Sequence, residues 1–284
     1  MCDELTADDN DRFLSRRDFG AVTGAVGLAM MLPAPANART IAGRDVMIET
    51  PDGHCDAYFV APSGVRSPAV LVWPDIMGLR PAFRKMADRL AQSGYAVLTV
   101  NQFYRSTKAP FLAAGESFDQ PAVRERIGPW REELTPAATT RDAAAFLTWI
   151  DKQREVDPRR GIGSTGYCMG GPMTFRTAAA NPTRVRAIGA FHPAGLVTDT
   201  PDSPHLLVPR MRAAALVAIA ANDDARSPND KTALRSAFAS AKRPAEIEVY
   251  AGTMHGWCPP DSRVYNRAEA ERAWARQLAT LQRL

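Results

Sequence analysis

A tight turn between a predicted strand and a predicted helix, Gly166-Tyr-Cys-Met-Gly-Gly171, is the feature that most constrains the fold of this 284-residue chain. A strand is expected over residues 160–165, and helical residues follow the turn as far as Ala180. In a G-x-C-x-G turn the flanking glycines leave room for neighbouring backbone, and the central residue takes a strained conformation above the end of the sheet. The sequence therefore predicts an α/β fold in which Cys168 projects from this turn at a helix N-terminus.

The same alternation of apolar strands and amphipathic helices extends along the chain after residue 38. Turn residues Pro51-Asp52-Gly53 separate the first two strands and predict a β-hairpin at a sheet edge. Several later strands are continuous apolar runs, which are typical of a buried parallel sheet. Residues 101–135 carry prolines and charges without clear periodicity, so we expect an excursion over the active-site face. Strands are expected at 46–49, 57–61, 69–73, 95–100, 160–165, 185–191, 214–220 and 247–250, and helices near 83–90, 136–153, 229–241 and 268–284.

The first 38 residues have the layout of an export signal. Ser15-Arg16-Arg17-Asp18-Phe19 contains paired arginines, a weakly polar stretch covers residues 20–32, and Ala36-Asn37-Ala38 offers small residues for cleavage. We expect recognition by the twin-arginine (Tat) export machinery, cleavage after Ala38, and a periplasmic or secreted protein. The alternatives are an ordinary amphipathic N-terminal helix and an uncleaved signal that tethers the protein to a membrane. Because a spanning helix needs ~20 apolar residues, no stable membrane partner is expected.

Residues 39–284 are expected to form one domain, since the chain has globular proportions: 45% hydrophobic and 23% charged residues. The net charge is +4, but the basic residues are not clustered, which argues against nucleic-acid binding. Loss of the acidic N-terminal segment would make the remainder more positive and would modestly favour anionic substrates. Three of the four cysteines follow residue 38, and an exported protein can form disulfides. The sequence leaves open whether Cys55 and Cys258 form one.

Candidates for an acid and a base follow two later strands. Asp223 and Asp224 come shortly after residues 214–220, and His255 lies in the loop after residues 247–250. Parallel strands bring these loops to one edge of the sheet, and the order nucleophile, acid, histidine is that of α/β-hydrolases. Taken alone, each residue has a structural alternative: a buried cysteine in a glycine-rich turn, or a loop histidine with satisfied hydrogen bonds. Together they predict an α/β-hydrolase fold, with a mostly parallel central sheet and helices on both faces.

Four segments resemble the dienelactone hydrolase (carboxymethylenebutenolidase) family, and the resemblance extends over essentially all of residues 39–284. The resemblance implies that Cys168 is the nucleophile, that His255 is its base, and that Asp223 rather than Asp224 orients the histidine. The segments are Trp73-Pro-Asp-Ile-Met-Gly78, Asn101-Gln-Phe-Tyr104, Gly166-Tyr-Cys-Met-Gly-Gly171 and Tyr250-Ala-Gly-Thr-Met-His255-Gly.

Two loops are expected to hold the oxyanion of the reaction. The turn at the helix N-terminus presents the backbone N–H of Met169, and the resemblance implies that the N–H of Ile76 is the second donor. By the same resemblance, Asp75 stands where a glutamate of the family contacts the resting thiol. Its side chain is one methylene shorter, which puts a role in thiol activation in question.

The remaining candidates concern the substrate. Arg105 lies one residue away from a position where arginines of the family hold the substrate carboxylate. No arginine stands at the second such position, and Arg263 is the nearest. Tyr104, His192 and Trp257 are candidates for the pocket wall, and the alternative for each is a structural role in packing or hydrogen bonding.

We therefore expect hydrolysis of a small-molecule ester or lactone, including an anionic one, through a Cys168 thioester and without a cofactor. No metal site is expected, because His54 and His205 lack ligand partners at a useful spacing. Two alternatives belong to other classes: a non-catalytic ligand-binding protein on a hydrolase scaffold, and a thiol redox protein centred on Cys168. The sequence contains no C-x-x-C pair, which disfavours the redox alternative.

Overall fold

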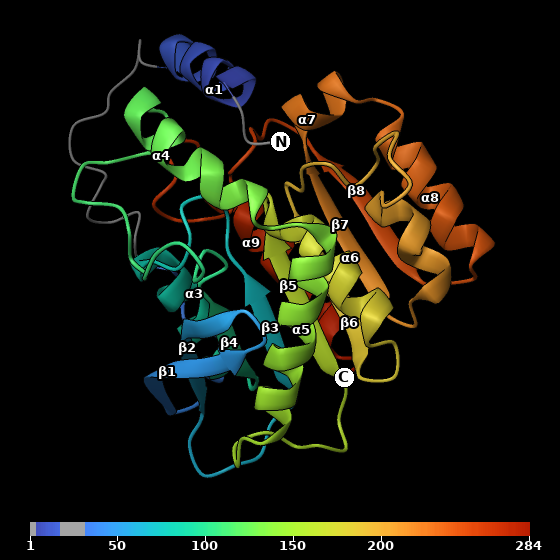
Figure 1. Cartoon of the computed structure of the whole chain (residues 1–284). Helices are drawn as coiled ribbons and strands as arrows, with labels where there is room; N and C mark the ends of the chain where they lie inside the picture. Colours follow the sequence, from blue (N-terminus) through green and yellow to red (C-terminus); the bar gives the residue numbers. More distant parts are fainter. Residues whose placement is uncertain (1–3, 18–31) are drawn as a thin grey trace.

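The computed structural model describes residues 4–17 and 32–284 (Figure 1). Across these residues eight strands form one sheet in the order β1-β2-β4-β3-β5-β6-β7-β8. The strands from β4 to β8 in this order are parallel, β2 is antiparallel to β4, and β1 is antiparallel to β2 at the edge. The edge hairpin and the mostly parallel sheet are thus confirmed. The strands are β1 (Ile41–Thr50), β2 (Gly53–Pro62), β3 (Ala69–Trp73), β4 (Ala96–Val100), β5 (Ile162–Tyr167), β6 (Val185–Phe191), β7 (Ala214–Ala220) and β8 (Ala245–Tyr250).

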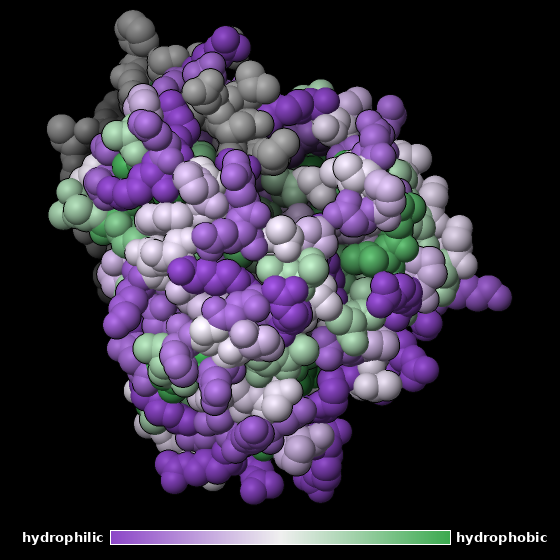
Figure 2. Space-filling model, viewed as in Figure 1, coloured by the Kyte–Doolittle hydropathy of each residue, from purple (hydrophilic) through white to green (hydrophobic). Residues whose placement is uncertain are grey.

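Helices cover both faces of the sheet, as the sequence predicts (Figure 1). α3 (Pro81–Gln92) and α9 (Arg267–Leu281) bury their apolar sides against one face. α5 (Pro136–Asp151), α6 (Gly170–Ala180) and α8 (Asp230–Ser240) pack on the other. Because the sheet is covered on both sides, its central strands are apolar throughout. Hydrophilic side chains dominate the outer surface seen in Figure 2.

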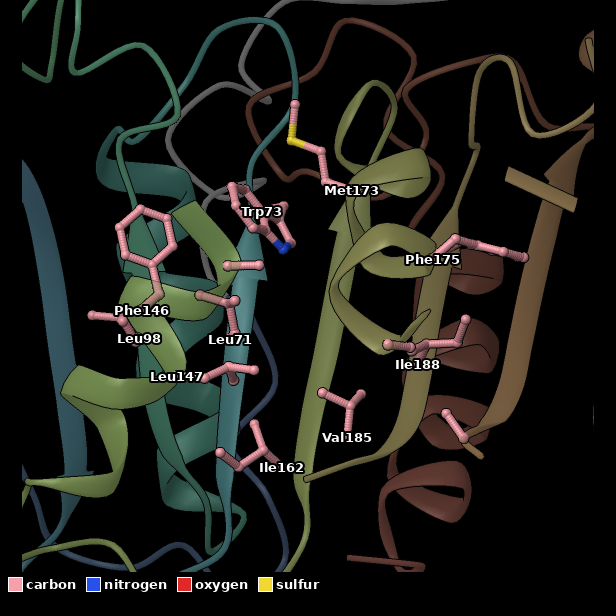
Figure 3. Packing of buried hydrophobic residues seen from close by; sticks show 14 of the residues in the cluster. Leu71, Trp73, Leu98, Phe146, Leu147, Ile162, Met173, Phe175, Val185 and Ile188 are labelled. Atoms are coloured by element: carbon pink, nitrogen blue, oxygen red, sulfur yellow. The ribbon is translucent and has the colours of Figure 1, made fainter. Parts of the chain in front are cut away.

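The core between the sheet, α5 and α6 positions the end of β3 (Figure 3). Trp73 is the last residue of β3 and is fully buried, with its ring 5.5 Å from that of Phe146. Its indole N–H donates to the hydroxyl of Thr177 on α6 at 3.2 Å. The loop after β3 and the helix α6 are therefore fixed to each other through one buried side chain. The surrounding apolar residues are Leu71, Leu98, Leu147, Ile162, Met173, Phe175, Val185 and Ile188.

The segment over residues 101–135 contains a helix that sequence reasoning missed. α4 (Pro121–Glu132) buries only Val123 and Ile127, so its apolar periodicity is too weak to detect. Pro129 inside the helix lowers its intrinsic helical propensity as well. The helix forms because tertiary contacts of its two buried residues override that propensity.

Three smaller differences also have local causes. β1 begins at Ile41 rather than at residue 46, because the added part of this edge strand is largely exposed and shows no apolar alternation. The 3-10 helix η1 (Pro204–Arg210) and the short helix α7 (Ala221–Arg226) were not predicted. α7 has no buried residue and η1 buries only Pro204 and Val208, so neither shows the apolar face by which a helix is recognised.

α1 (Glu4–Arg17) is the described part of the segment expected to be an export signal. It lies beside α4 and α7, near the edge where the parallel strands end (Figure 1). The weakly polar stretch of that signal covers residues 20–32, and all of it except Leu32 lies outside the described residues. Among residues 4–17 and 32–284, no helix is both long and apolar enough to cross a membrane.

Cys55 and Cys258 are both free and buried, so they do not form a disulfide with each other. The Cys55 thiol donates to the carbonyls of Asp56 and Asn101, each at 3.4 Å. Burial raises the pKa of both thiols well above the usual value, and the nearby Asp56 carboxylate adds to the rise at Cys55. A raised pKa lowers the thiolate fraction near neutrality, and the thiolate is the reactive form.

We predict that Cys55 and Cys258 do not react with a water-soluble disulfide reagent in the native protein. The protein would be reduced, freed of reductant and labelled at neutral and mildly alkaline pH, and the labelled sites would be mapped by peptide mass spectrometry. Both thiols should react at once after denaturation, which is the internal control. Rapid native labelling of either residue would contradict its burial and its raised pKa.

Candidate active site

The turn between β5 and α6 holds Cys168 in a left-handed conformation. Cys168 has φ +54°, and its N–H donates to the carbonyl of Phe191 at 3.0 Å. A Cβ at Gly166 would lie 2.0 Å from the carbonyl oxygen of Gly170. A Cβ at Gly170 would lie 2.4 Å from the carbonyl oxygen of Trp73. The facing atoms are backbone atoms that cannot move aside, so both positions require glycine, and the strained turn expected from the sequence is present.

A histidine and a carboxylate meet above the ends of β7 and β8. His255 Nδ1 lies 2.7 Å from Asp223 Oδ2. Asn222 Oδ1 accepts the backbone N–H of His255 at 2.8 Å, which fixes the histidine loop to the start of α7. Asp224 instead binds Lys231, whose Nζ lies 2.7 and 2.8 Å from the two carboxylate oxygens. Of the two candidate acids, Asp223 is therefore the one that contacts His255.

Cys168 and His255 line one pocket of about 680 Å³, a volume that includes its opening to solvent. Cys168 is 1% and His255 4% exposed, so solvent reaches little of either side chain. Residues 117–119 line the same pocket, so the segment over 101–135 does pass over this face. Among the described residues, no group of three or more histidine, cysteine or carboxylate side chains is arranged to hold a metal ion.

Two backbone N–H groups next to Cys168 are available to bind a carbonyl oxygen. Ile76 follows β3 and lines the pocket, and Met169 is the residue that precedes α6. Within the described part of the chain, neither N–H has a hydrogen-bond acceptor. The approach of Gly170 to the Trp73 carbonyl keeps the two loops side by side. Donors fixed in this way by backbone packing are what an oxyanion hole requires.

The family model for dienelactone hydrolases matches residues 55–284. The chain belongs to this family. Carboxymethylenebutenolidase 2 of Cupriavidus pinatubonensis is 30% identical over 195 residues, which are 68% of this chain and 74% of the relative. A carboxymethylenebutenolidase of Rhodococcus opacus is 25% identical over 191 residues, 66% of this chain and 69% of the relative.

The same fold occurs in a Klebsiella pneumoniae protein of known structure that is assigned to the dienelactone hydrolases. It superposes with a TM-score of 0.75 at 23% identity, covering 87% of this chain and 100% of that one. The α/β-hydrolase fold is therefore confirmed. By its family, the chain is an ester or lactone hydrolase.

In this member of the dienelactone hydrolase family, Arg80 binds the Asp75 carboxylate. Arg80 Nη1 and Nη2 lie 2.7 and 3.0 Å from the two Asp75 oxygens, and the Met77 N–H donates to the same carboxylate at 2.9 Å. Arg80 also binds Asp261, through Nε at 2.6 Å and Nη2 at 2.9 Å. Burial lowers the pKa of Arg80, but the two carboxylates more than reverse this and raise it. Asp75 thus lines the pocket with its charge already matched.

Sequence reasoning did not select Arg80, which joins the loop after β3 to a loop near the C-terminus. The Asp261 partner is 181 residues away along the chain, and no local pattern marks such a pair. Asn222 was also missed, although its position beside Asp223 is a signal that could have identified it. Both residues position loops of the site and do not contact the reacting groups.

Tyr104 and Arg105 do not line the catalytic pocket of this hydrolase. Arg105 donates to both oxygens of Asp142 at 2.8 and 2.7 Å, and to Asp52 at 2.6 Å. The Tyr104 hydroxyl donates to the same Asp142 at 2.7 Å. This cluster ties the β1–β2 turn to α5. The expectation that the two residues bind substrate is corrected, because Asp142 draws both side chains into this polar cluster.

His192 does line the pocket, with its ring centroid 5.2 Å from that of His255. Both of its ring nitrogens are buried and have no hydrogen-bond partner among the residues described. Burial lowers the pKa of His192 well below its usual value, and the neighbouring His255 lowers it further, so the ring is neutral near pH 7. Trp257 packs behind it, 5.3 Å from both the His192 and Tyr250 rings, and does not line the pocket.

α1 lies across the opening of the pocket. Thr6 lines the pocket and is almost fully buried. Asp9 accepts a hydrogen bond from Arg226 at 2.6 Å, and Asp11 accepts one from Arg263 at 3.0 Å. The segment expected to be an export signal thus contacts the catalytic face through ion pairs.

We predict that Gly170→Ala destabilises the hydrolase far more than Gly128→Ala does. A methyl group at Gly170 meets the Trp73 carbonyl, and overpacking of this kind costs about 3 kcal/mol. A methyl group at Gly128, inside α4, meets nothing within 4 Å beyond its chain neighbours. Its gain in helix propensity is opposed by the ring of Pro129, which follows it, so Gly128→Ala should change the free energy of unfolding by less than about 1 kcal/mol. Urea unfolding curves of the two variants measure both effects. Equal stability of Gly170→Ala and wild type would show that the two loops are not in backbone contact.

Proposed function

We propose that this chain hydrolyses an ester or lactone through Cys168 as nucleophile, His255 as general base and Asp223 as the group that orients the histidine. The observation that carries the proposal is the convergence of three chain segments. His255, bound by Asp223 at 2.7 Å, lines the same pocket as Cys168, which projects from the strained turn. A nucleophile, a base and an orienting carboxylate are the parts that covalent acyl transfer requires.

In the proposed first step, His255 accepts the Cys168 proton and the sulfur attacks the substrate carbonyl. The N–H groups of Ile76 and Met169 donate to the oxyanion, and the N-terminus of α6 favours negative charge there. The C–O bond then breaks, and His255 protonates the leaving alkoxide, which leaves a thioester on Cys168. In the second step His255 activates a water that releases the acid and restores the thiol. Asp223 holds the histidine tautomer throughout.

The reaction class is tested by mass spectrometry of reduced protein after a brief pulse of p-nitrophenyl acetate. An acetyl adduct on Cys168 that decays as product appears would support the thioester mechanism. Tight ligand binding without any adduct would favour a non-catalytic binding protein. Peroxide or disulfide chemistry that Cys168→Ser abolishes and His255→Ala retains would favour a thiol redox protein.

We predict that Asp223→Asn lowers kcat by roughly 10³- to 10⁴-fold, because the amide no longer holds the required histidine tautomer. Asp224→Asn is the matched control: it makes the same chemical change one residue away, where the carboxylate binds Lys231. It should leave kcat within about twofold of wild type. Steady-state hydrolysis of p-nitrophenyl acetate measures both. The reverse order of effects would move the orienting acid to Asp224.

We further propose that residues 1–38 are an export signal read by the twin-arginine machinery and cleaved after Ala38. The paired Arg16-Arg17 and the small residues before the cleavage point support this proposal. The contacts of Asp9 and Asp11 on the catalytic face give cleavage a second consequence, since removal of α1 would open the pocket.

We predict that a bacterium with a functional twin-arginine pathway releases a periplasmic product whose N-terminus is Arg39. Exchange of both Arg16 and Arg17 for lysine should abolish this product, and Arg12→Lys, just outside the pair, should not. Cell fractionation and N-terminal sequencing provide the readout. Recovery of the intact chain in the cytoplasm from every host would contradict the export proposal, and an intact chain in the membrane fraction would contradict cleavage.

A further inference from the structure

A second cavity borders the two oxyanion loops without reaching His255. It has a volume of about 1190 Å³ including its opening, and Ile76 and Met169 form part of its wall. The rest of the wall comes from α4, Leu134 just after it, the first two turns of α6 and residues 194–195. Ile76 lines both cavities. A substrate carbonyl bound by the two N–H groups would therefore have one branch in the catalytic pocket and the other in this second cavity.

Arg176 is a basic residue in the wall of the second cavity. It lies on α6, eight residues after Cys168, and in the described part of the chain no carboxylate forms a salt bridge with it. Its Nε is buried and has no hydrogen-bond acceptor there. Burial lowers the pKa of Arg176, and the charge of Asp202 acts in the opposite direction. A partly buried cation without an acceptor is costly, and a bound anion would offset that cost.

The two arginines named from the sequence, Arg105 and Arg263, are already bound to carboxylates of the protein. The guanidinium of Arg105 binds both oxygens of Asp142, and that of Arg263 binds Asp119 at 2.7 Å. A substrate anion could use either one only by displacing a protein carboxylate. No such displacement is needed at Arg176.

The remaining charged groups of the cavity come from α4. Arg131 lines it and, among the described residues, forms no side-chain salt bridge. Of the described residues in the wall, Glu132 is the acidic one, and it is exposed, so water screens its charge. Leu134 and Met173 add apolar surface to the wall. The wall thus combines cationic groups with apolar surface suited to methylene groups.

We propose that this cavity binds the acyl branch of the substrate and that this branch ends in a carboxylate held by Arg176, with Arg131 assisting. The substrate class is a half-ester of a dicarboxylic acid, which water converts into the dicarboxylate and an alcohol. A guanidinium binds a carboxylate through two parallel hydrogen bonds, which sets the position of the acyl chain as well as its charge. This inference rests on the thioester mechanism proposed above.

The test compares monoethyl esters of the linear dicarboxylic acids from succinate to pimelate with ethyl esters of the monocarboxylic acids of the same carbon number. Wild type should prefer a half-ester of one length over its neutral counterpart. Arg176→Met should lower kcat/KM for that half-ester by about 10- to 100-fold and for the neutral ester by less than about threefold. Arg176→Lys should retain part of the preference, and Arg131→Met should lose less of it than Arg176→Met.

Arg154→Met is the matched control, since the side chain of this arginine is 91% exposed and does not line the cavity. It should leave kcat/KM unchanged for both the half-ester and the neutral ester. Unfolding curves of every variant show whether the fold is retained. Two results would contradict the subsite and leave the hydrolase mechanism intact. In one, wild type forms the Cys168 thioester but shows no preference for half-esters; in the other, Arg176→Met lowers kcat/KM equally for the half-ester and the neutral ester. If no ester acylates Cys168, the mechanism and the subsite are both wrong.

Discussion

The close approach of two backbone segments, Gly170 to the carbonyl of Trp73, is the contact on which the site depends. It places the start of α6, and with it Cys168, against the loop after β3 that carries Ile76. The indole of Trp73 holds the same helix two turns further on, through Thr177. Because Trp73 is fully buried, the spacing of the proposed oxyanion donors is set by the core and not by mobile side chains.

Two ionic clusters, each built around a buried carboxylate, position further loops. In one, Arg80 lies between Asp75 and Asp261, and in the other Arg105 lies between Asp142 and Asp52. The desolvation of buried charges offsets much of their attraction, so such clusters add little net stability. Loss of one partner would nevertheless leave a buried charge unmatched, which penalises any other arrangement of the loops. The clusters therefore serve mainly to define loop positions. Arg80 and Arg105 are each already bound to two carboxylates of the protein.

The parts of the site that the sequence predicts are those with a local signal. Cys168, Asp223 and His255 each follow a run of strand residues, and a parallel sheet necessarily gathers such positions at one edge. Arg105 was wrongly predicted to bind substrate. Its partner Asp142 lies on a helix 37 residues later, and no sequence feature near Arg105 indicates that pairing. α4 was missed for a related reason. Its two buried residues suffice to pack it against the domain, but they are too few to produce a recognisable helical periodicity of apolar residues. Contacts between residues far apart in the chain, and elements held in place by such contacts, could not be predicted from the sequence. The ends of the strands could be predicted, because each strand has a local apolar signal.

The distribution of matched and unmatched arginines links the two proposals about this hydrolase. On the catalytic side, Arg226 and Arg263 are matched in part by Asp9 and Asp11 of α1. Removal of residues 1–38 would strip these carboxylates away and leave a more positive rim around the opening. Arg176, on the other side of the oxyanion loops, needs no such change to bind an anion. Cleavage would therefore open the route to Cys168 and strengthen the attraction of anionic esters to it, while the choice among acyl groups would already be built into α6.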